Sequence, residues 1–303
     1  MGNKYPLVTV IIATYNSPIT LQCAIQSVLN QDFKDFEVLV IGDCCPADYG
    51  NVVNNFNDDR LHWFNLPQNV GSQYGPNNEG IKRSRGKYIA YLGHDDLWFS
   101  NHLSSLVGYL EETDSDLVHC LSTLISPIGA YKVIGPPANG RNYSNCHVPP
   151  SSWLYKKSLT DECGLWHKQE LLSVGADQDY LNRIALLGKK IKFYNNLMVL
   201  KFVSGDWGLY SKKNNFPQLY YLEKLEKDPK KLIEETLFEL ATRFSMTYAE
   251  RKPILVSLRS LLGNTLFYLF KFSTRNKWPL NKIRIYFYQR VRRKNRKFRG
   301  LEN

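Results

Sequence analysis

Two adjacent carboxylates, Asp95 and Asp96, closely follow the apolar run Tyr88–Leu92. Five apolar residues in succession predict a buried parallel strand, and open α/β sheets bind ligands at the carboxyl ends of such strands. Neighbouring carboxylates repel each other unless a cation lies close to them, so the pair predicts a metal-assisted nucleotide site. The alternative is a solvated loop whose acids cap the following helix.

The segments around this pair alternate between strand and helix, which is the pattern of a parallel α/β sheet. We expect further strands at Leu7–Ala13, Glu37–Ile41, Leu61–Phe64, Asp116–Ile125, Ile191–Tyr194 and Leu197–Phe202. Helices are expected from Pro18, at Pro76–Arg85, at Leu103–Leu110, at Asp177–Leu187 and from Pro217 onward. Residues 127–152 are rich in Pro, Gly and Asn and predict a long loop.

The basic charge of the chain lies in its C-terminal part. The 303 residues carry a net charge of +11, yet residues 251–303 contain 15 Lys and Arg and a single acid, Glu302. The preceding body is therefore close to neutral and shows no nucleic-acid-binding signature. Its cysteines lack zinc-type spacing, and the N-terminus has no secretory pattern, so we expect reduced thiols in a cytosolic protein.

Several separated segments together resemble the family-2 glycosyltransferases of the GT-A fold. The similarity is close over residues 6–100 and continues less tightly to about residue 205. It rests on Val8–Asn16, Ala24–Gln31, Phe36–Asp43, Asn69–Gly71, Asn78–Gly80, Gly86–Leu92 and Asp95–Trp98. The resemblance implies a single α/β domain of GT-A type with a Rossmann-like, mostly parallel sheet, followed by C-terminal helices and a basic amphipathic tail.

The resemblance also implies a site for a nucleotide-diphosphate sugar. It assigns nucleotide-sugar contacts to Thr14, Tyr15, Asp43, Asn78 and Asp95. Within that set, Asp43 would meet a uracil-like base edge or the ribose, and Asp95 would face the ribose. Asp96 would bind the divalent metal, Mg²⁺ or Mn²⁺, that bridges the diphosphate. Such a cation stabilises the leaving nucleoside diphosphate, and one or two carboxylates plus the phosphates are enough to hold it.

The chain departs from the family pattern where acids are usual. Gly42, Gly93 and Ala176 each stand at a position that is commonly acidic in the family. Loss of the first two acids would affect base preference or metal dependence. The loss of all three leaves open a non-catalytic protein that binds nucleotide sugars or acts as a scaffold.

The resemblance places the catalytic base at Asp177, at the start of a predicted helix. Inverting transfer needs a base to remove a proton from the acceptor hydroxyl. The alternative for Asp177 is a first-turn acid that interacts favourably with the helix dipole. Lys201 and Ser204 lie where the family often has a loop that closes on the diphosphate.

Aromatic residues between the carboxylate pair and the predicted base are candidates for an acceptor site. Trp153, Trp166 and His167 suit sugar stacking and hydroxyl recognition, with core packing or a strand end as the alternative.

The sequence divides into three parts: the glycosyltransferase domain 1–215, a helical extension 216–250 and the tail 251–303. Mixed aromatic and basic residues in the tail suit an anionic membrane surface; a disordered or partner-binding tail, or a nucleic-acid-binding one, is the alternative. We therefore expect a cytoplasmic enzyme, peripheral on the inner face of the membrane. Its donor would be a UDP-sugar in preference to dTDP- or GDP-sugars, and its acceptor a glycan or lipid-linked glycan of surface polysaccharide or lipopolysaccharide.

Overall fold

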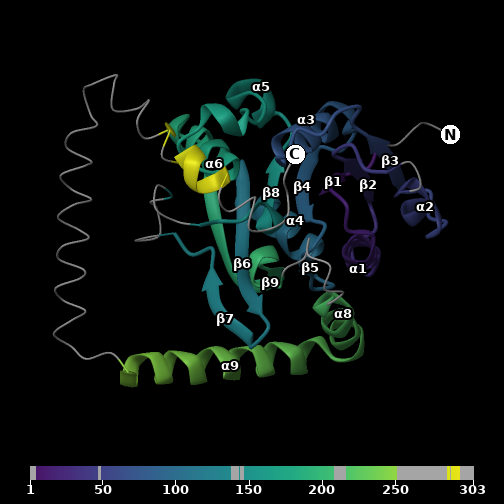
Figure 1. Ribbon diagram of the computed structural model, residues 1–303. Helices are drawn as coiled ribbons and strands as arrows, with labels where there is room; N and C mark the ends of the chain where they lie inside the picture. The colour runs from purple at the N-terminus through teal and green to yellow at the C-terminus, as the bar shows by residue number, and fades with distance from the viewer. Residues whose placement is uncertain are drawn as a thin grey trace, which may run out of the picture.

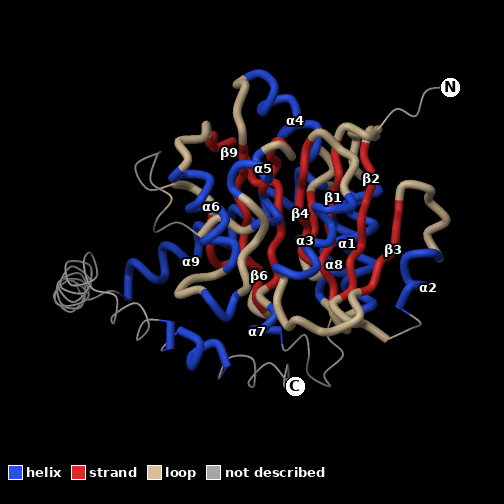
Figure 2. Tube along the Cα trace, turned by 90° about the horizontal axis from the view of Figure 1, so that it is seen from above, coloured by secondary structure: helices blue, strands red, loops and turns tan. Residues whose placement is uncertain are grey.

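One mixed sheet runs through the part of the chain that the computed structural model describes, residues 5–46, 49–137, 143, 147–207, 216–250, 285–286 and 288–293 (Figure 1). Its strands are β1 Val8–Thr14, β2 Phe36–Gly42, β3 Leu61–Asn65, β4 Tyr88–Gly93, β5 Leu97–Trp98, β6 Leu117–Ser126, β7 Gly129–Ile134, β8 Trp153–Lys156 and β9 Ile191–Phe202. They follow the order β3-β2-β1-β4-β8-β6-β9-β5, and β7 pairs with β6. Figure 2 shows β3, β2, β1 and β4 side by side, with β6 and β9 beyond them.

The first four strands form the predicted parallel α/β sheet. β1 pairs in parallel with β2 on one side and β4 on the other, so that Thr14 lies opposite Gly42 and Ala13 opposite Gly93. The carboxyl ends of β1, β2 and β4 therefore meet at one edge. Chain order reverses at β1, since β2 lies on one side and β4 on the other, and such a reversal opens a crevice for ligands.

Helices cover both faces of the sheet. They are α1 Pro18–Leu29, α2 Tyr49–Asn54, α3 Tyr74–Arg83, α4 His102–Glu112, α5 Leu159–Cys163, α6 Ala176–Leu186, α7 Ser204–Trp207, α8 Pro217–Lys227 and α9 Pro229–Glu250. Side chains of α1, α2 and α4 share one core with the sheet, and those of α3, α5 and α6 share a second core on its other face. Among the described helices, none is both long enough and apolar enough to cross a bilayer.

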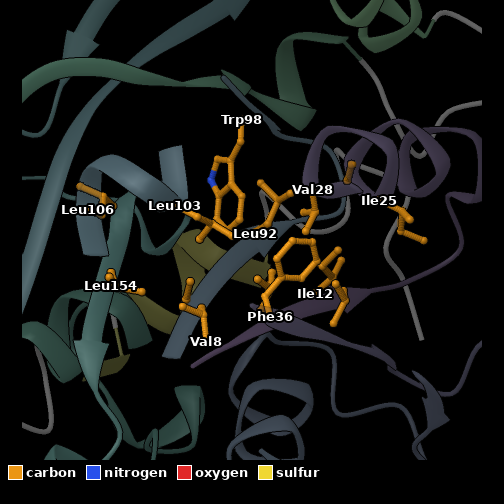
Figure 3. Close-up of a cluster of buried hydrophobic side chains, with 14 of the residues drawn as sticks. Val8, Ile12, Ile25, Val28, Phe36, Leu92, Trp98, Leu103, Leu106 and Leu154 are labelled. Carbon is orange, nitrogen blue, oxygen red and sulfur yellow. The ribbon is translucent and has the colours of Figure 1, made fainter. Parts of the chain in front are cut away.

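The two-sided burial explains why the strands are continuous apolar runs. Successive residues of a strand point to opposite faces, so Val8 and Ile12 enter the core shown in Figure 3, and Ile11 enters the other. In Figure 3, Trp98 packs between α1 and α4 residues such as Val28 and Leu103. All of these side chains are at most 1% exposed.

The structure differs from the sequence predictions in one loop and in one boundary between strands. The predicted loop 127–152 is wrong over β7, which forms a hairpin with β6 through a turn at Pro127 and Ile128, next to Gly129 at φ 93°. The predicted strands Ile191–Tyr194 and Leu197–Phe202 form a single strand, β9, whose pairing with β6 shifts register between them. Asn195 and Asn196 fall at this register shift, between the partners Phe193 and Leu197, so the strand continues through them without regular pairing.

The helices α8 and α9 pack against the far end of the sheet. Leu225 and Leu232 share a third core with β5, β7 and β9 residues. The α9 carboxylate Glu239 accepts a hydrogen bond from the Ala130 backbone N–H at 2.7 Å, and Figure 1 shows α9 lying across the tip of the β6–β7 hairpin. The N-terminus of α8 reaches the carboxylate pair, because Gln218 Nε2 donates to the Asp95 carbonyl at 3.0 Å.

Packing leaves no space for an acidic side chain at Gly42 or Gly93, the last residues of β2 and β4. These are two of the positions where the resemblance leads us to expect an acid. A Cβ at Gly42 would lie 2.5 Å from Asn65 Oδ1 and 2.6 Å from the Trp63 ring. A Cβ at Gly93 would lie 2.8 Å from Asp96 Oδ2. Trp63 and Asp96 thus fill the volume that those side chains would need.

We expect Gly42→Ala to lower the free energy of unfolding by about 1–3 kcal/mol, because the added methyl displaces Trp63 and the Asn65 amide. The matched control is Gly108→Ala in α4, where an added Cβ meets nothing within 4 Å. That change should raise stability by about 0.5–1 kcal/mol through helix propensity. Denaturant unfolding measures both, and equal stability of the two variants would contradict the packing account.

Candidate functional site

A cavity of about 250 Å³ lies at the sheet edge where β1, β2 and β4 end. Its wall combines residues that follow these strands with a turn before α3 and residues from two distant segments. The main contributors are Thr14, Tyr15, Asp43, Asn69, Gly71, Gln73, Asn77, His94, Asp95, Ser151 and Lys201. The sheet topology alone therefore brings the predicted residues Thr14, Tyr15, Asp43 and Asp95 to one site.

One end of the cavity offers polar atoms without partners. Thr14 is 2% exposed, and its Oγ1 and the Oδ1 of Asn69 are buried atoms with no hydrogen-bond partner among the described residues. Leaving a polar atom buried and unpaired costs free energy. A ligand with hydrogen-bond donors would satisfy both atoms.

Asp43 shapes the same end of the cavity. Its two carboxylate oxygens accept hydrogen bonds from the backbone N–H groups of Val70 at 2.8 Å and Gly71 at 2.9 Å. Its carbonyl accepts a further hydrogen bond from Asn69 Nδ2 at 2.9 Å. Gly71 has φ 65°, in the left-handed region that favours glycine. Asp43 therefore fixes the turn that presents Asn69.

The two adjacent carboxylates have different environments. Asp95 lines the cavity, whereas Asp96 is 0% exposed and does not. Asp96 Oδ2 accepts hydrogen bonds from Ser151 Oγ at 2.6 Å and Lys201 Nζ at 2.8 Å, and Oδ1 accepts one from the Phe202 backbone N–H at 3.2 Å. The protein's own donors thus occupy both Asp96 oxygens.

Burial and the ion pair have opposite effects on the pKa values of Asp96 and Lys201. Burial raises the pKa of Asp96, and the attraction of Lys201 offsets only part of that effect. Burial lowers the pKa of Lys201, but the carboxylates of Asp96 and Asp95 outweigh it and raise the pKa above the ordinary value. Lys201 therefore stays protonated at neutral pH.

The residues present fit a divalent cation held mainly by a ligand. The described part of the chain has no group of three or more His, Cys, Asp or Glu side chains that could hold a metal by themselves. Mg²⁺, however, is commonly bound by one or two carboxylates together with substrate phosphates. Asp95, on the cavity wall, is a carboxylate that can take this role.

The predicted base, Asp177, lies in the first turn of α6, and its Oδ1 accepts a hydrogen bond from the Gln178 backbone N–H at 2.9 Å. Asp177 does not line the cavity. Its charge nevertheless contributes to the raised pKa of Lys201 and, after burial, to that of Tyr288. The charge of Asp177 therefore acts on Lys201, although Asp177 does not line the cavity.

The aromatic acceptor candidates lie mostly in the core. Trp153 is 0% and Trp166 3% exposed. Trp166 stacks on Tyr180 with ring centroids 5.0 Å apart and donates from Nε1 to Tyr91 Oη at 2.9 Å. Both tryptophans therefore have a packing role under the site.

The remaining two predicted residues are held by neighbouring groups. The side-chain amide of Asn78 exchanges two hydrogen bonds with the Trp166 backbone, at 2.8 and 2.9 Å, and does not line the cavity. His167 is exposed, and its Nδ1 lies 3.0 Å from Asp179 Oδ2. Asn78 therefore positions the Trp166 segment.

Two residues that contribute to the site, Ser151 and Arg292, were not predicted from the sequence. Ser151 belongs to a Pro- and Ser-rich run whose composition suggested only a loop, yet it donates to Asp96 and accepts from the Gly93 N–H at 3.1 Å. Arg292, in the basic tail, donates to the Gly71 carbonyl at 3.1 Å and lies 3.6 Å from Glu170. This C-terminal segment is the yellow helix beside α6 in Figure 1. The sequence contained no signal for that contact, and most of the tail lies outside the described residues.

Comparison with known proteins agrees with this architecture. Residues 9–131 match the family described as Glycosyl transferase family 2. Over 107 residues, the chain is 39% identical to GalNAc(5)-diNAcBac-PP-undecaprenol beta-1,3-glucosyltransferase of Campylobacter jejuni; the match covers 34% of this chain and 34% of that protein. The chain thus spans about a third of the length of that relative.

Two solved structures share the fold. Staphylococcus aureus TarS 1–349 in complex with UDP-GlcNAc has a TM-score of 0.55 at 19% identity, covering 69% of this chain and 60% of that one. Mannosyltransferase PcManGT from Pyrobaculum calidifontis, in complex with GDP-Man and Mn²⁺, has a TM-score of 0.54 at 15% identity, covering 95% and 87%. Residues 9–131 therefore match glycosyl transferase family 2, and they lie within a domain that shares the GT-A fold of these two structures.

Proposed function

We propose that this protein is a glycosyltransferase that transfers a sugar from a nucleotide-diphosphate donor bound in the cavity at the carboxyl ends of β1, β2 and β4. The observation that carries the proposal is the composition of that cavity. Unpaired buried oxygens of Thr14 and Asn69 lie in the same cavity as the carboxylate of Asp95. A nucleobase with N–H donors, joined to a charged diphosphate, matches this combination.

The proposed donor is a UDP-sugar. Uracil presents one imide N–H between two carbonyl groups, and an acceptor such as Asn69 Oδ1 pairs with that N–H, while the Thr14 hydroxyl can donate to a carbonyl. The related fold of TarS holds UDP-GlcNAc, which supports this choice. The related fold of PcManGT holds GDP-Man, so the nucleobase of the donor has to be tested directly.

We assign the metal-facing carboxylate to Asp95 and depart from the sequence-based assignment to Asp96. A metal ligand needs a lone pair directed at the ion, and the oxygens of Asp96 already accept from Ser151, Lys201 and Phe202. Asp95 lies on the cavity wall and has no such set of donors among the described contacts. A bound Mg²⁺ or Mn²⁺ supplies Lewis-acid stabilisation of the departing diphosphate.

The proposed acceptor is a lipid-linked glycan of a surface polysaccharide, and the proposed base is Asp177. The Campylobacter relative is named for a PP-undecaprenol-linked acceptor. Asp177 lies outside the cavity wall but close enough to influence Lys201, as expected for a base that meets the acceptor hydroxyl beyond the donor. Attack from that side would invert the anomeric carbon.

We expect Asp177→Asn to lower the transfer rate by about 100-fold or more, because the acceptor hydroxyl loses its general base. UDP affinity should stay within about twofold, since the side chain keeps its shape and does not line the donor cavity. Transfer is measured with a UDP-sugar and a diphosphate-linked glycolipid, and binding by calorimetry.

The matched control for this test is Asp179→Asn. It removes the same charge two residues along α6, where the carboxylate binds Arg183 at 3.0 Å. This variant should lose stability but keep its transfer rate per folded molecule. Undiminished turnover by Asp177→Asn would exclude Asp177 as the base.

We also propose that the protein associates with the anionic inner face of the membrane through its basic tail. The helix α9, which precedes the tail in the sequence, adds exposed apolar side chains, Leu237, Phe238, Phe244 and Met246, which are 54–75% exposed. Such a surface would keep the enzyme close to a lipid-linked acceptor.

The full-length protein should co-sediment with phosphatidylglycerol vesicles at low salt and be released at about 1 M salt, where the Debye length is about 3 Å. A variant with Lys294, Arg296, Lys297 and Arg299 changed to Gln should bind more weakly, since each basic residue contributes about 1 kcal/mol near the surface. Equal binding to zwitterionic phosphatidylcholine vesicles, or full binding by the variant, would refute an electrostatic role of the tail.

A further inference from the structure

Lys201, at the end of β9, places an ammonium group on the wall of the donor cavity. Its Nζ lies 2.8 Å from Asp96 Oδ2, and its side chain is 25% exposed, whereas that of Asp96 is 0% exposed. An ammonium group has three N–H donors, and within the described residues Asp96 accepts the one hydrogen bond that Lys201 donates. Two donors of Lys201 therefore remain for a ligand in the cavity that it lines.

The surroundings hold this ammonium in place. Asp96 is itself fixed by Ser151 Oγ and the Phe202 N–H, so the acceptor that orients Lys201 cannot rotate freely. Lys201 and Leu200 lie in β9, where Leu200 pairs with Leu97 of β5. Lys201 is therefore part of the sheet, and Asp96 directly precedes one of its strands.

We propose that Lys201 binds the diphosphate of the nucleotide directly, and that Asp96 positions Lys201 instead of coordinating a metal. This inference rests on the proposed donor site and extends it. A nucleoside diphosphate brings several negative charges next to Asp95, which repels it. The ammonium of Lys201 supplies a fixed countercharge there, so phosphate recognition has a part that needs no metal ion.

A purely structural role of Lys201 is the competing explanation. A buried carboxylate needs a partner, and Lys201 would provide one even if no phosphate ever approached it. The two roles differ in their consequences for binding. A structural Lys201 affects folding but not the preference of the site for UDP over uridine, which lacks the phosphates.

The experiment compares the affinities of uridine and UDP by calorimetry, in EDTA and in MnCl₂. The variants are Asp96→Asn, Lys201→Met and the double change Asp96→Asn with Lys201→Met. Lys201→Met alone leaves the Asp96 carboxylate buried and unpaired, which threatens folding. The double variant removes both charges together and avoids that problem. Lys192→Met, an exposed position on the same strand, removes the same charge away from the cavity.

In EDTA, wild type and Lys192→Met should bind UDP roughly 10- to 100-fold more tightly than uridine, as expected for charge-assisted hydrogen bonds. The double variant should lose this preference while it keeps its affinity for uridine. Asp96→Asn should keep most of the preference, because the amide oxygen of the new side chain can still accept the hydrogen bond from Lys201. It should still bind UDP more tightly when Mn²⁺ is added, because Asp95 is intact.

An unchanged UDP preference in the folded double variant would overturn the proposal and leave Lys201 a structural role. Loss of the Mn²⁺ effect in Asp96→Asn would return the metal to Asp96 and also overturn it. If wild type binds uridine in EDTA but binds UDP no more tightly, the role of Lys201 would be rejected but the donor site would not. Failure of wild type to bind either compound, with or without Mn²⁺, would reject the donor site itself.

Discussion

Burial of the Asp96 carboxylate is the constraint on which the rest of the site depends. A charge at 0% exposure is stable only with several donors, and these come from three separate places: Ser151 before β8, and Lys201 and Phe202 at the end of β9. The segment after β4 is thereby tied to the C-terminal half of the sheet. Asp95, one residue earlier, is left on the cavity wall.

A second constraint comes from the parallel pairing of β1 with β2 and β4. It brings Thr14, Asp43 and Asp95 to one edge, although they are far apart in the chain. Packing then decides which acids the edge can hold. Trp63 fills the space next to Gly42, and the Asp96 carboxylate fills that next to Gly93. The absence of acids at Gly42 and Gly93 is thus explained by side chains that fill the space at this edge. This weakens the interpretation of the chain as a non-catalytic protein.

The sequence was sufficient for the parts of the fold that depend on local pattern. Apolar runs such as Tyr88–Leu92 predicted the central strands, because both faces of the sheet are covered and every side chain in such a run is buried. The strand β7 was missed because its pairing with β6, and not its own composition, makes it a strand.

The site was predictable where residues lie at the end of a strand or within two residues after it, as Thr14, Tyr15, Asp43 and Asp95 do. It was not predictable where long-range contacts decide. Sequence spacing cannot distinguish the roles of the neighbours Asp95 and Asp96, since that depends on Ser151 and Lys201, which lie 55 and 105 residues away from Asp96. Similarly, only the fold reveals that Asn78 holds the Trp166 backbone and that Arg292 reaches the Gly71 turn.

The first experiment to carry out is a crystal structure of the protein with UDP and Mn²⁺. We expect the uracil ring against Thr14 and Asn69, and the diphosphate within hydrogen-bond distance of Lys201 Nζ. The metal should be on Asp95, with Asp96 still hydrogen-bonded to Lys201 and Ser151. Nucleotide bound away from this cavity, or a metal coordinated by Asp96 with Lys201 displaced, would contradict this expectation.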